Sequence, residues 1–212
     1  MTLDTGGVRR GQQMEKGRVE AFSDGVIAVI ITIMVLELKP PHEATWDALA
    51  GNWHAFVSYI LSFVYVGLYW NNHHHLFSTC RHVDGKVMWA NLFFLFWLSL
   101  FPFTTSWLNE AEPVPAIVPT AAYGFVLLMA ALSWLPLSRA LIACNGGADS
   151  ALARATRSRG ADWKTLASLG IYVAALVLAA FAPIVSCVLY AVVAILWIVP
   201  DRRVERVVGA GR

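Results

Sequence analysis

Long apolar blocks follow one another along almost the whole of this 212-residue chain. A helix of about 20 apolar residues crosses the hydrocarbon core of a bilayer. The chain is 58% hydrophobic and only 14% charged, a composition that a water-soluble domain does not bury. Alternating ten-residue segments, which are typical of outer-membrane barrels, are absent, so helices must satisfy the backbone hydrogen bonds. We therefore predict an all-α integral membrane protein.

The apolar blocks predict six transmembrane helices. We expect them near residues 19–38, 52–77, 87–109, 115–140, 163–181 and 184–200. Turn-forming residues separate the blocks: Pro40 and Pro41 end the first, and Asn145, Gly146 and Gly147 open the longest loop. The first block contains Asp24 and lacks a small-residue cleavage site, so we expect it to stay as a span rather than act as a signal peptide.

The blocks also divide the chain into three regions. These are a flexible cytoplasmic N-terminus over residues 1–17, a six-helix transmembrane channel domain over 18–200, and a basic cytoplasmic tail over 201–212.

Lysine and arginine predict the orientation of the spans. Of the 16 such residues, only Lys39 falls on the side that carries the first, third and fifth connections, where it stands among acidic residues such as Glu43 and Glu110. The positive-inside rule therefore places both termini in the cytoplasm. The basic clusters are explained by this topology and by contact with anionic lipids, so we predict no nucleic-acid partner.

The first span carries polar residues at its start. Residues 18–38 read RVEAFSDGVIAVIITIMVLEL, with Arg18, Glu20, Ser23 and Asp24 at or inside the beginning of the helix. An ionisable group there costs about 3 kcal/mol if it faces lipid, so these groups should face protein or water, with Arg18 the nearest candidate partner for Asp24. Alternatively, they cap the helix and anchor it at the headgroups.

An apolar stripe continues along the same span. Val29, Thr32, Ile33 and Leu36 share one helical face over about 10 Å. The stripe fits a buried helix seam. It equally fits a narrow hydrophobic pore, in which copies of the helix face one another and Thr32 supplies a ring of hydroxyls.

Three consecutive histidines, His73, His74 and His75, lie at the end of the second span. Successive helical residues point about 100° apart, so the three cannot converge on one ion, and we predict neither a metal site nor a cofactor. Histidine protonation could couple pH to function. Ser23 and Asp24 lack a nucleophile-elbow or oxyanion-glycine pattern, so we predict no enzymatic activity.

Four motifs occur in order over the first half of the chain. They are RxxxFSD (Arg18, Phe22, Ser23, Asp24), WxxHHxLF (Trp70, His73, His74, Leu76, Phe77), NL (Asn91, Leu92) and LPFxT (Leu100, Pro102, Phe103, Thr105, with Phe101 inserted after the leucine). With the hydropathy profile, they resemble the transmembrane protein 175 family, potassium channels of endosomes and lysosomes with bacterial relatives. Residues 111–212 add only hydropathy to this resemblance.

The resemblance implies a homotetramer in which four first helices surround a central pore, since animal members contain two such repeats and this chain shows no second FSD motif. It implies that Val29 forms the constriction, Thr32 the hydroxyl ring and Leu36 the outer hydrophobic ring. Relatives often carry a larger residue at the position of Val29, so Ile33 could share its role. No TVGYG-like filter is present, so we expect modest selectivity for potassium.

The resemblance further implies that the FSD motif braces the first helix. Arg18, Ser23 and Asp24 would hydrogen-bond with Trp70, His73, His74 and Asn91. Glu37 could attract cations to the outer mouth.

We therefore predict a potassium-permeable channel of the bacterial inner membrane, whose partners are other copies of itself, membrane lipids and potassium ions. The alternative is a proton- or ion-coupled secondary transporter that uses Asp24 and His73–His75, which predicts broken helices and internal pseudo-symmetry. A non-conducting membrane scaffold is a third possibility.

Overall fold

The computed structural model describes residues 6–147, 153 and 161–198, with side chains of the first helix described from residue 16. In this part of the chain all regular structure is helical, which confirms the all-α prediction. The helices are α1 (Gly6–Leu36), α2 (Trp46–Gly51), α3 (Trp53–Thr79), α4 (Gly85–Ser99), α5 (Phe101–Glu110), α6 (Ile117–Cys144), α8 (Ala161–Ala179) and α9 (Pro183–Ile198).

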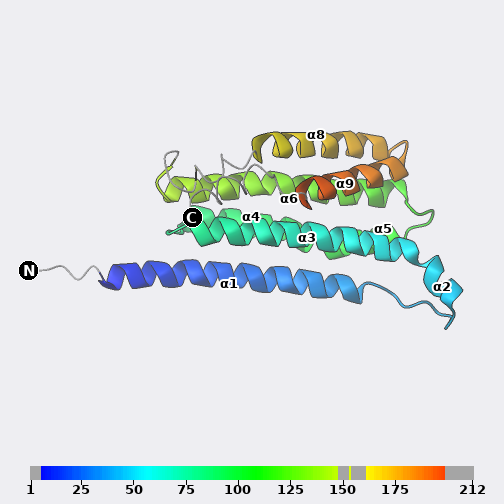
Figure 1. The fold of residues 1–212 in the computed structure, drawn as a ribbon, viewed down its shortest axis with the longest axis horizontal. Coiled ribbons are helices and arrows are strands. Elements are labelled where there is room, and N and C mark those ends of the chain that lie inside the picture. The colour runs from blue at the N-terminus through cyan, green and yellow to red at the C-terminus, as the bar shows by residue number, and fades with distance from the viewer. Residues whose placement is uncertain (1–5, 148–152, 154–160, 199–212) are drawn as a thin grey trace, which may run out of the picture.

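The long helices run side by side in one bundle, with α1 at one edge and α8 at the opposite edge (Figure 1). Helix α1 packs against α3, α4 and α5, whereas α6 packs against α4, α5, α8 and α9. The described helices therefore cover one side of α1 and leave its other side without a neighbour among them.

The helices agree with the predicted spans to within four residues, except at two places. Helix α1 begins at Gly6 rather than near residue 19, and residues 87–109, predicted as one span, are divided into α4 and α5 at Leu100. Pro102 explains the division, because it has no N–H to donate to the carbonyl four residues earlier. Residues 199 and 200, at the end of the sixth predicted span, lie outside the described residues.

Three segments of the described chain are long and apolar enough to cross a membrane: Lys16–Leu36, Gly85–Glu110 and Ile117–Cys144. Trp163–Ala179 and Pro183–Ile198 are shorter apolar helices. Helix α3 has the length of a span, but its tyrosines, asparagines and histidines lower its hydropathy. The count of six spans stays a prediction.

Charge separates the two ends of the bundle. At one end, the side-chain oxygen of Asn145 accepts the backbone N–H groups of Arg81 at 2.6 Å and His82 at 2.9 Å, so two loops with basic neighbours meet there. At the other end, Lys39 pairs with Glu110. The predicted tail 201–212 and the predicted inner residues Arg154, Arg157 and Arg159 lie outside the described residues.

Buried hydroxyl groups join the helices on the far side of α3. Ser62 hydrogen-bonds with Thr105 at 2.7 Å and with Tyr123 at 3.0 Å, which connects α3 to α5 and α6. The Tyr65 hydroxyl donates to the Tyr190 carbonyl at 2.6 Å, which connects α3 to α9. Such bonds hold membrane helices together where lipid offers the polar groups no partner. These bonds join α3, α5, α6 and α9, and α1 packs against α3 and α5 of this set.

Candidate functional site around helix α1

Helix α1 has two faces of different burial. Ser23, Ile27, Ile30 and Met34 follow one another at intervals of three or four residues, and each is at most 3% exposed. This spacing places them on one side of the helix, which is the side packed against α3, α4 and α5. The contacts of α1 within the chain thus fix both its position and its rotation.

The predicted pore stripe lies on the other face. Val29 is 55% exposed, Ile33 is 41% exposed and Leu36 is 79% exposed, and Thr32 is also exposed. The Thr32 hydroxyl donates to the Val29 carbonyl at 2.9 Å, within the helix itself. These four residues are therefore not a seam between helices of the part of the chain that the structure describes. They form an apolar surface that lacks cover from the described residues.

A buried chain of hydrogen bonds fastens α1 to α4 and α3. The Asn91 amide group donates to the Ser23 hydroxyl oxygen at 2.8 Å, and the Ser23 hydroxyl donates to the Val19 carbonyl at 2.8 Å. The Asn91 oxygen lies 2.9 Å from His73 Nε2. Since the Asn91 NH₂ already faces Ser23, His73 Nε2 carries the proton and donates.

The ring of His73 is enclosed by aromatic side chains. It stacks on Phe77, with 4.3 Å between the ring centroids, and lies nearly parallel to Phe94 at 6.1 Å. Its Nδ1 is buried without a hydrogen-bond partner. A neutral imidazole fits this apolar environment, because a charged ring would require a partner for each nitrogen.

A second set of contacts joins α1 to α3 beside this buried chain. Trp70 Nε1 donates to the Asp24 carboxylate at 3.0 Å, and the ring of His74 stacks on Trp70 with centroids 6.0 Å apart. His74 Nδ1 lies 3.6 Å from the Glu20 carboxylate. The sequence motifs do not place Glu20 in this group, although it lies one helical turn before Asp24.

Two residues of the RxxxFSD motif are not part of these contacts. Among the described interactions, no ion pair joins Arg18 to Asp24, so the sequence-based partner for Asp24 is replaced by Trp70. Phe22 is 53% exposed. It does not join these contacts and instead lines a groove between α1 and the α4–α5 segment. The structure thus brings together Ser23, Asp24, Trp70, His73, His74 and Asn91 and leaves Arg18 and Phe22 outside this set.

The opposite end of α1 is fastened by exposed polar groups. The Ser106 hydroxyl lies 2.9 Å from a Glu37 carboxylate oxygen and 3.2 Å from one of Glu110, and Lys39 Nζ lies 2.7 Å from the Glu110 carboxylate. Glu37, the predicted outer-mouth residue, therefore stands beside α5 at the end of the bundle away from the basic loops.

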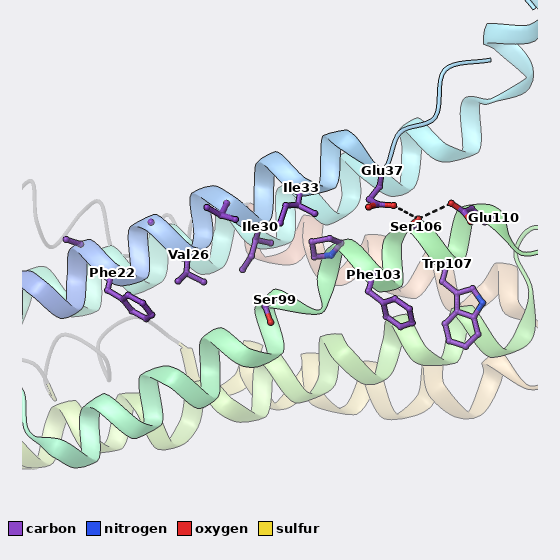
Figure 2. A pocket seen from close by; sticks show the side chains of 14 residues that line it. Phe22, Val26, Ile30, Ile33, Glu37, Ser99, Phe103, Ser106, Trp107 and Glu110 are labelled. Carbon is purple, nitrogen blue, oxygen red and sulfur yellow. Dashed lines mark hydrogen bonds between the residues drawn. The ribbon is translucent and has the colours of Figure 1, made fainter. Parts of the chain in front are cut away.

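An open groove of about 940 Å³ runs between α1 and the α4–α5 segment. Phe22, Val26 and Ile30 project from α1 toward it, and Glu37, Ser106 and Glu110 gather at one end (Figure 2). Val29 and Ile33 line the groove as well as the exposed stripe. Sequence reasoning missed this groove, although Pro102 in the middle of an apolar block signals the helix break that borders it.

No group of three or more His, Cys, Asp or Glu side chains could hold a metal ion in the part of the chain that the structure describes. His73 points to Asn91, whereas His74 lies on Trp70. The two rings thus serve different contacts.

Comparison with known proteins identifies relatives across most of the chain. Residues 18–102 match the family described as the endosomal/lysosomal potassium channel TMEM175. A potassium channel of Chryseobacterium sp. (strain P1-3) is 46% identical over 193 residues, which cover 91% of this chain and 97% of the relative. A potassium channel of Streptomyces collinus is 38% identical over 74% of this chain and 79% of its own length.

A solved structure has the same fold. It is the crystal structure of a lysosomal potassium-selective channel TMEM175 homolog from Chamaesiphon minutus, with a TM-score of 0.75 and 26% sequence identity. The match covers 87% of this chain and 96% of the other.

Proposed function

Because this chain belongs to the TMEM175 family of potassium channels, we propose that it is a potassium channel whose pore is lined by α1. The observation that carries this proposal is the exposed stripe of Val29, Thr32, Ile33 and Leu36 on a helix whose other face is fixed by the rest of the chain. A single chain supplies one such stripe. A closed pore requires several copies, and a homotetramer arranges four of them around one axis.

The stripe favours a hydrophobic gate. Val29 and Leu36 are about 10 Å apart along the helix, and rings of apolar side chains at these two levels would exclude water when the pore is narrow. Thr32 would place a ring of hydroxyls between them. With no carbonyl filter in the sequence, the preference for potassium would come from pore diameter and the cost of dehydration, so selectivity over sodium would be modest.

The buried hydrogen bonds act as a brace in this proposal. Ser23, Asn91 and His73 fix the depth and rotation of α1, while Asp24 and Trp70 add a second bond on the same level. These residues contact one another rather than the stripe, so their role would be to position the pore helix. Ion coordination is not required of them, and we propose neither a cofactor nor a catalytic residue.

The charge distribution supports a location in the bacterial inner membrane with both termini in the cytoplasm. The brace would then lie toward the cytoplasm and Glu37 at the outer mouth. There its carboxylate would raise the local concentration of cations.

Potassium flux from liposomes tests the proposal. We expect Val29→Asn and Leu36→Asn each to raise flux about tenfold, corresponding to about 1.4 kcal/mol, because an amide wets a hydrophobic constriction. Val35→Asn is the matched control, since Val35 is exposed but lies about 100° from Leu36 around the helix axis. Flux that saturates and requires a counter-ion would contradict a channel and favour the transporter.

The mass of the protein in detergent tests the assembly separately. A mass of four chains of 23.3 kDa is expected. A stable monomer that conducts potassium would contradict the proposed central pore.

A further inference from the structure

A second cavity lies among the helices on the side of the bundle away from α1. The described residues that line it belong to α3, α6, α8 and α9, and none of them belongs to α1, α4 or α5. In Figure 1, α8 lies at the edge of the bundle opposite α1. The cavity is therefore separate from the exposed stripe and from the groove beside it.

The size and the walls of the cavity favour a compact ligand. Its volume is about 50 Å³, whereas one water molecule needs about 10–15 Å³, so a molecule of a few non-hydrogen atoms fits. Aromatic rings form much of the wall and would contact the apolar part of such a molecule. They belong to Tyr65, Tyr69, Trp134, Tyr172 and Trp197.

Several polar groups of the wall have unused hydrogen-bonding capacity. Among the described interactions, the side chains of Tyr69, Asn72 and Thr165 have no hydrogen-bond partner. Ser168 is 3% exposed and accepts the N–H of Trp197 at 2.9 Å, while no described acceptor receives its own O–H. A ligand hydroxyl can therefore both donate to this wall and accept from it.

The absence of charge in the wall discriminates between ligands. The described residues that line the cavity include no aspartate, glutamate, lysine, arginine or histidine. A charged ligand would lose its hydration there without gaining a counter-ion, which is costly. An uncharged molecule with an apolar body and one hydroxyl avoids this cost and satisfies the unpartnered groups.

We propose that this cavity binds a small alcohol, with its apolar part among the aromatic rings and its hydroxyl at the polar groups of α3 and α8. The bound alcohol bridges these two helices, which the hydroxyl of Tyr172 already joins by donating to that of Tyr65 at 3.3 Å. The site lies within one chain. It therefore requires neither the proposed tetramer nor potassium conduction.

Photolabelling with a diazirine alcohol tests the site. The full chain is placed in nanodiscs of phosphatidylcholine and irradiated with increasing concentrations of azibutanol, and the labelled peptides are measured by mass spectrometry. We expect saturable labelling of the α8 peptide that contains Tyr172, and unlabelled butanol should compete with it.

Tyr69→Phe tests recognition of the hydroxyl. This variant keeps the aromatic ring and breaks no described hydrogen bond. We expect the azibutanol concentration for half-maximal labelling of the Tyr172 peptide to rise about fivefold, because one hydrogen bond to the ligand is lost. Tyr59→Phe is the matched control, since Tyr59 is another half-buried tyrosine of α3 but does not line the cavity. Its half-maximal concentration should be unchanged.

The methyl ether of azibutanol is the matched probe, because it keeps the diazirine and the apolar body but cannot donate a hydrogen bond. We expect it to require about fivefold more probe than azibutanol. Equal binding of alcohol and ether, or equal binding by Tyr69→Phe and the unchanged chain, would overturn the proposal by showing an apolar void. Labelling that does not saturate would indicate partition from the bilayer, and absence of labelling at Tyr172 would indicate a cavity filled by water only. Either result would also overturn the proposal.

Discussion

The two faces of α1 have the same helical backbone and similar apolar residues but different partners. On one face, Ile27 and Met34 are each 1% exposed and Ser23 is hydrogen-bonded to α4. On the other, Leu36 is 79% exposed, and Val29 and Ile33 are 55% and 41% exposed. The described helices cover one face of α1 and leave the other uncovered.

The difference in burial assigns two roles to α1: the buried face positions the helix, and the exposed face is the one that can line a pore. The buried face needs shape and hydrogen bonds that match α3, α4 and α5, so changes there should reduce stability. The described residues of the chain do not pack over the exposed face, so its side chains need not match a neighbour among them. Substitutions on the exposed face should leave the folded chain intact. If this face lines a pore, they should change the potassium flux.

The largest difference in stability is expected for truncation of one residue on each face. Met34→Ala should lower the free energy of unfolding by about 2–5 kcal/mol, because it leaves a cavity among packed helices. Leu36→Ala, two residues further along the chain and on the exposed face, should change it by less than about 0.5 kcal/mol. Titration with sodium dodecyl sulfate in mixed micelles measures both. Equal losses would contradict the assignment of the two faces.

Removal of the brace should have an intermediate effect. Asn91→Leu leaves the Ser23 hydroxyl and His73 Nε2 without the amide that bridges them, and each unsatisfied buried group costs about 1–3 kcal/mol. We expect a loss of about 2 kcal/mol in the same titration. Asn71→Leu, on an exposed part of α3, serves as the control and should stay within about 0.5 kcal/mol. If both variants lose the same stability, the brace does not position α1.

The smallest effect is expected at the exposed outer end of α1. The hydrogen bond and the negative charge of Glu110 raise the pKa of Lys39 above its ordinary value of 10.5. A raised pKa means that the pair stabilises the fold below pH 10.5 and that this stabilisation is lost as the pH rises through the raised value. The difference in unfolding midpoint between the protein and Lys39→Gln should therefore shrink between about pH 8 and about pH 11.

Screening provides a second check on Lys39. Because this ion pair is exposed, added salt should also reduce the difference. A difference that grows with pH or persists in high salt would contradict this assignment.

The sequence predicts the helices well because span length and turn residues dictate them directly. It does not predict α2, whose start depends on the local hydrogen bond from the Ala48 N–H to the Thr45 hydroxyl. Nor does it predict the early start of α1 at Gly6, because glycine and charged residues give that segment no apolar pattern. The apolar block over residues 87–109 predicts one continuous span, whereas Pro102 at the start of α5 divides it.

The candidate site is predicted only where sequence spacing alone decides it. The positions of Val29, Thr32, Ile33 and Leu36 on one face follow from helical geometry. Whether that face is buried depends on the packing of other helices, which periodicity does not contain. The contacts of His74 with Glu20 and of Ser106 with Glu37 join segments 54 and 69 residues apart, so only the folded chain brings them together.

Cysteine accessibility along α1 tests most directly that its exposed face lines the pore. The three native cysteines are first replaced by alanine or serine, and single cysteines are then introduced between residues 27 and 36. A charged methanethiosulfonate reagent is applied during potassium flux from liposomes. We predict block of flux at positions 29, 32 and 36, and unchanged flux at positions 27, 30 and 34. Block at the second set, or flux unaffected at the first, would contradict a pore lined by this face of α1.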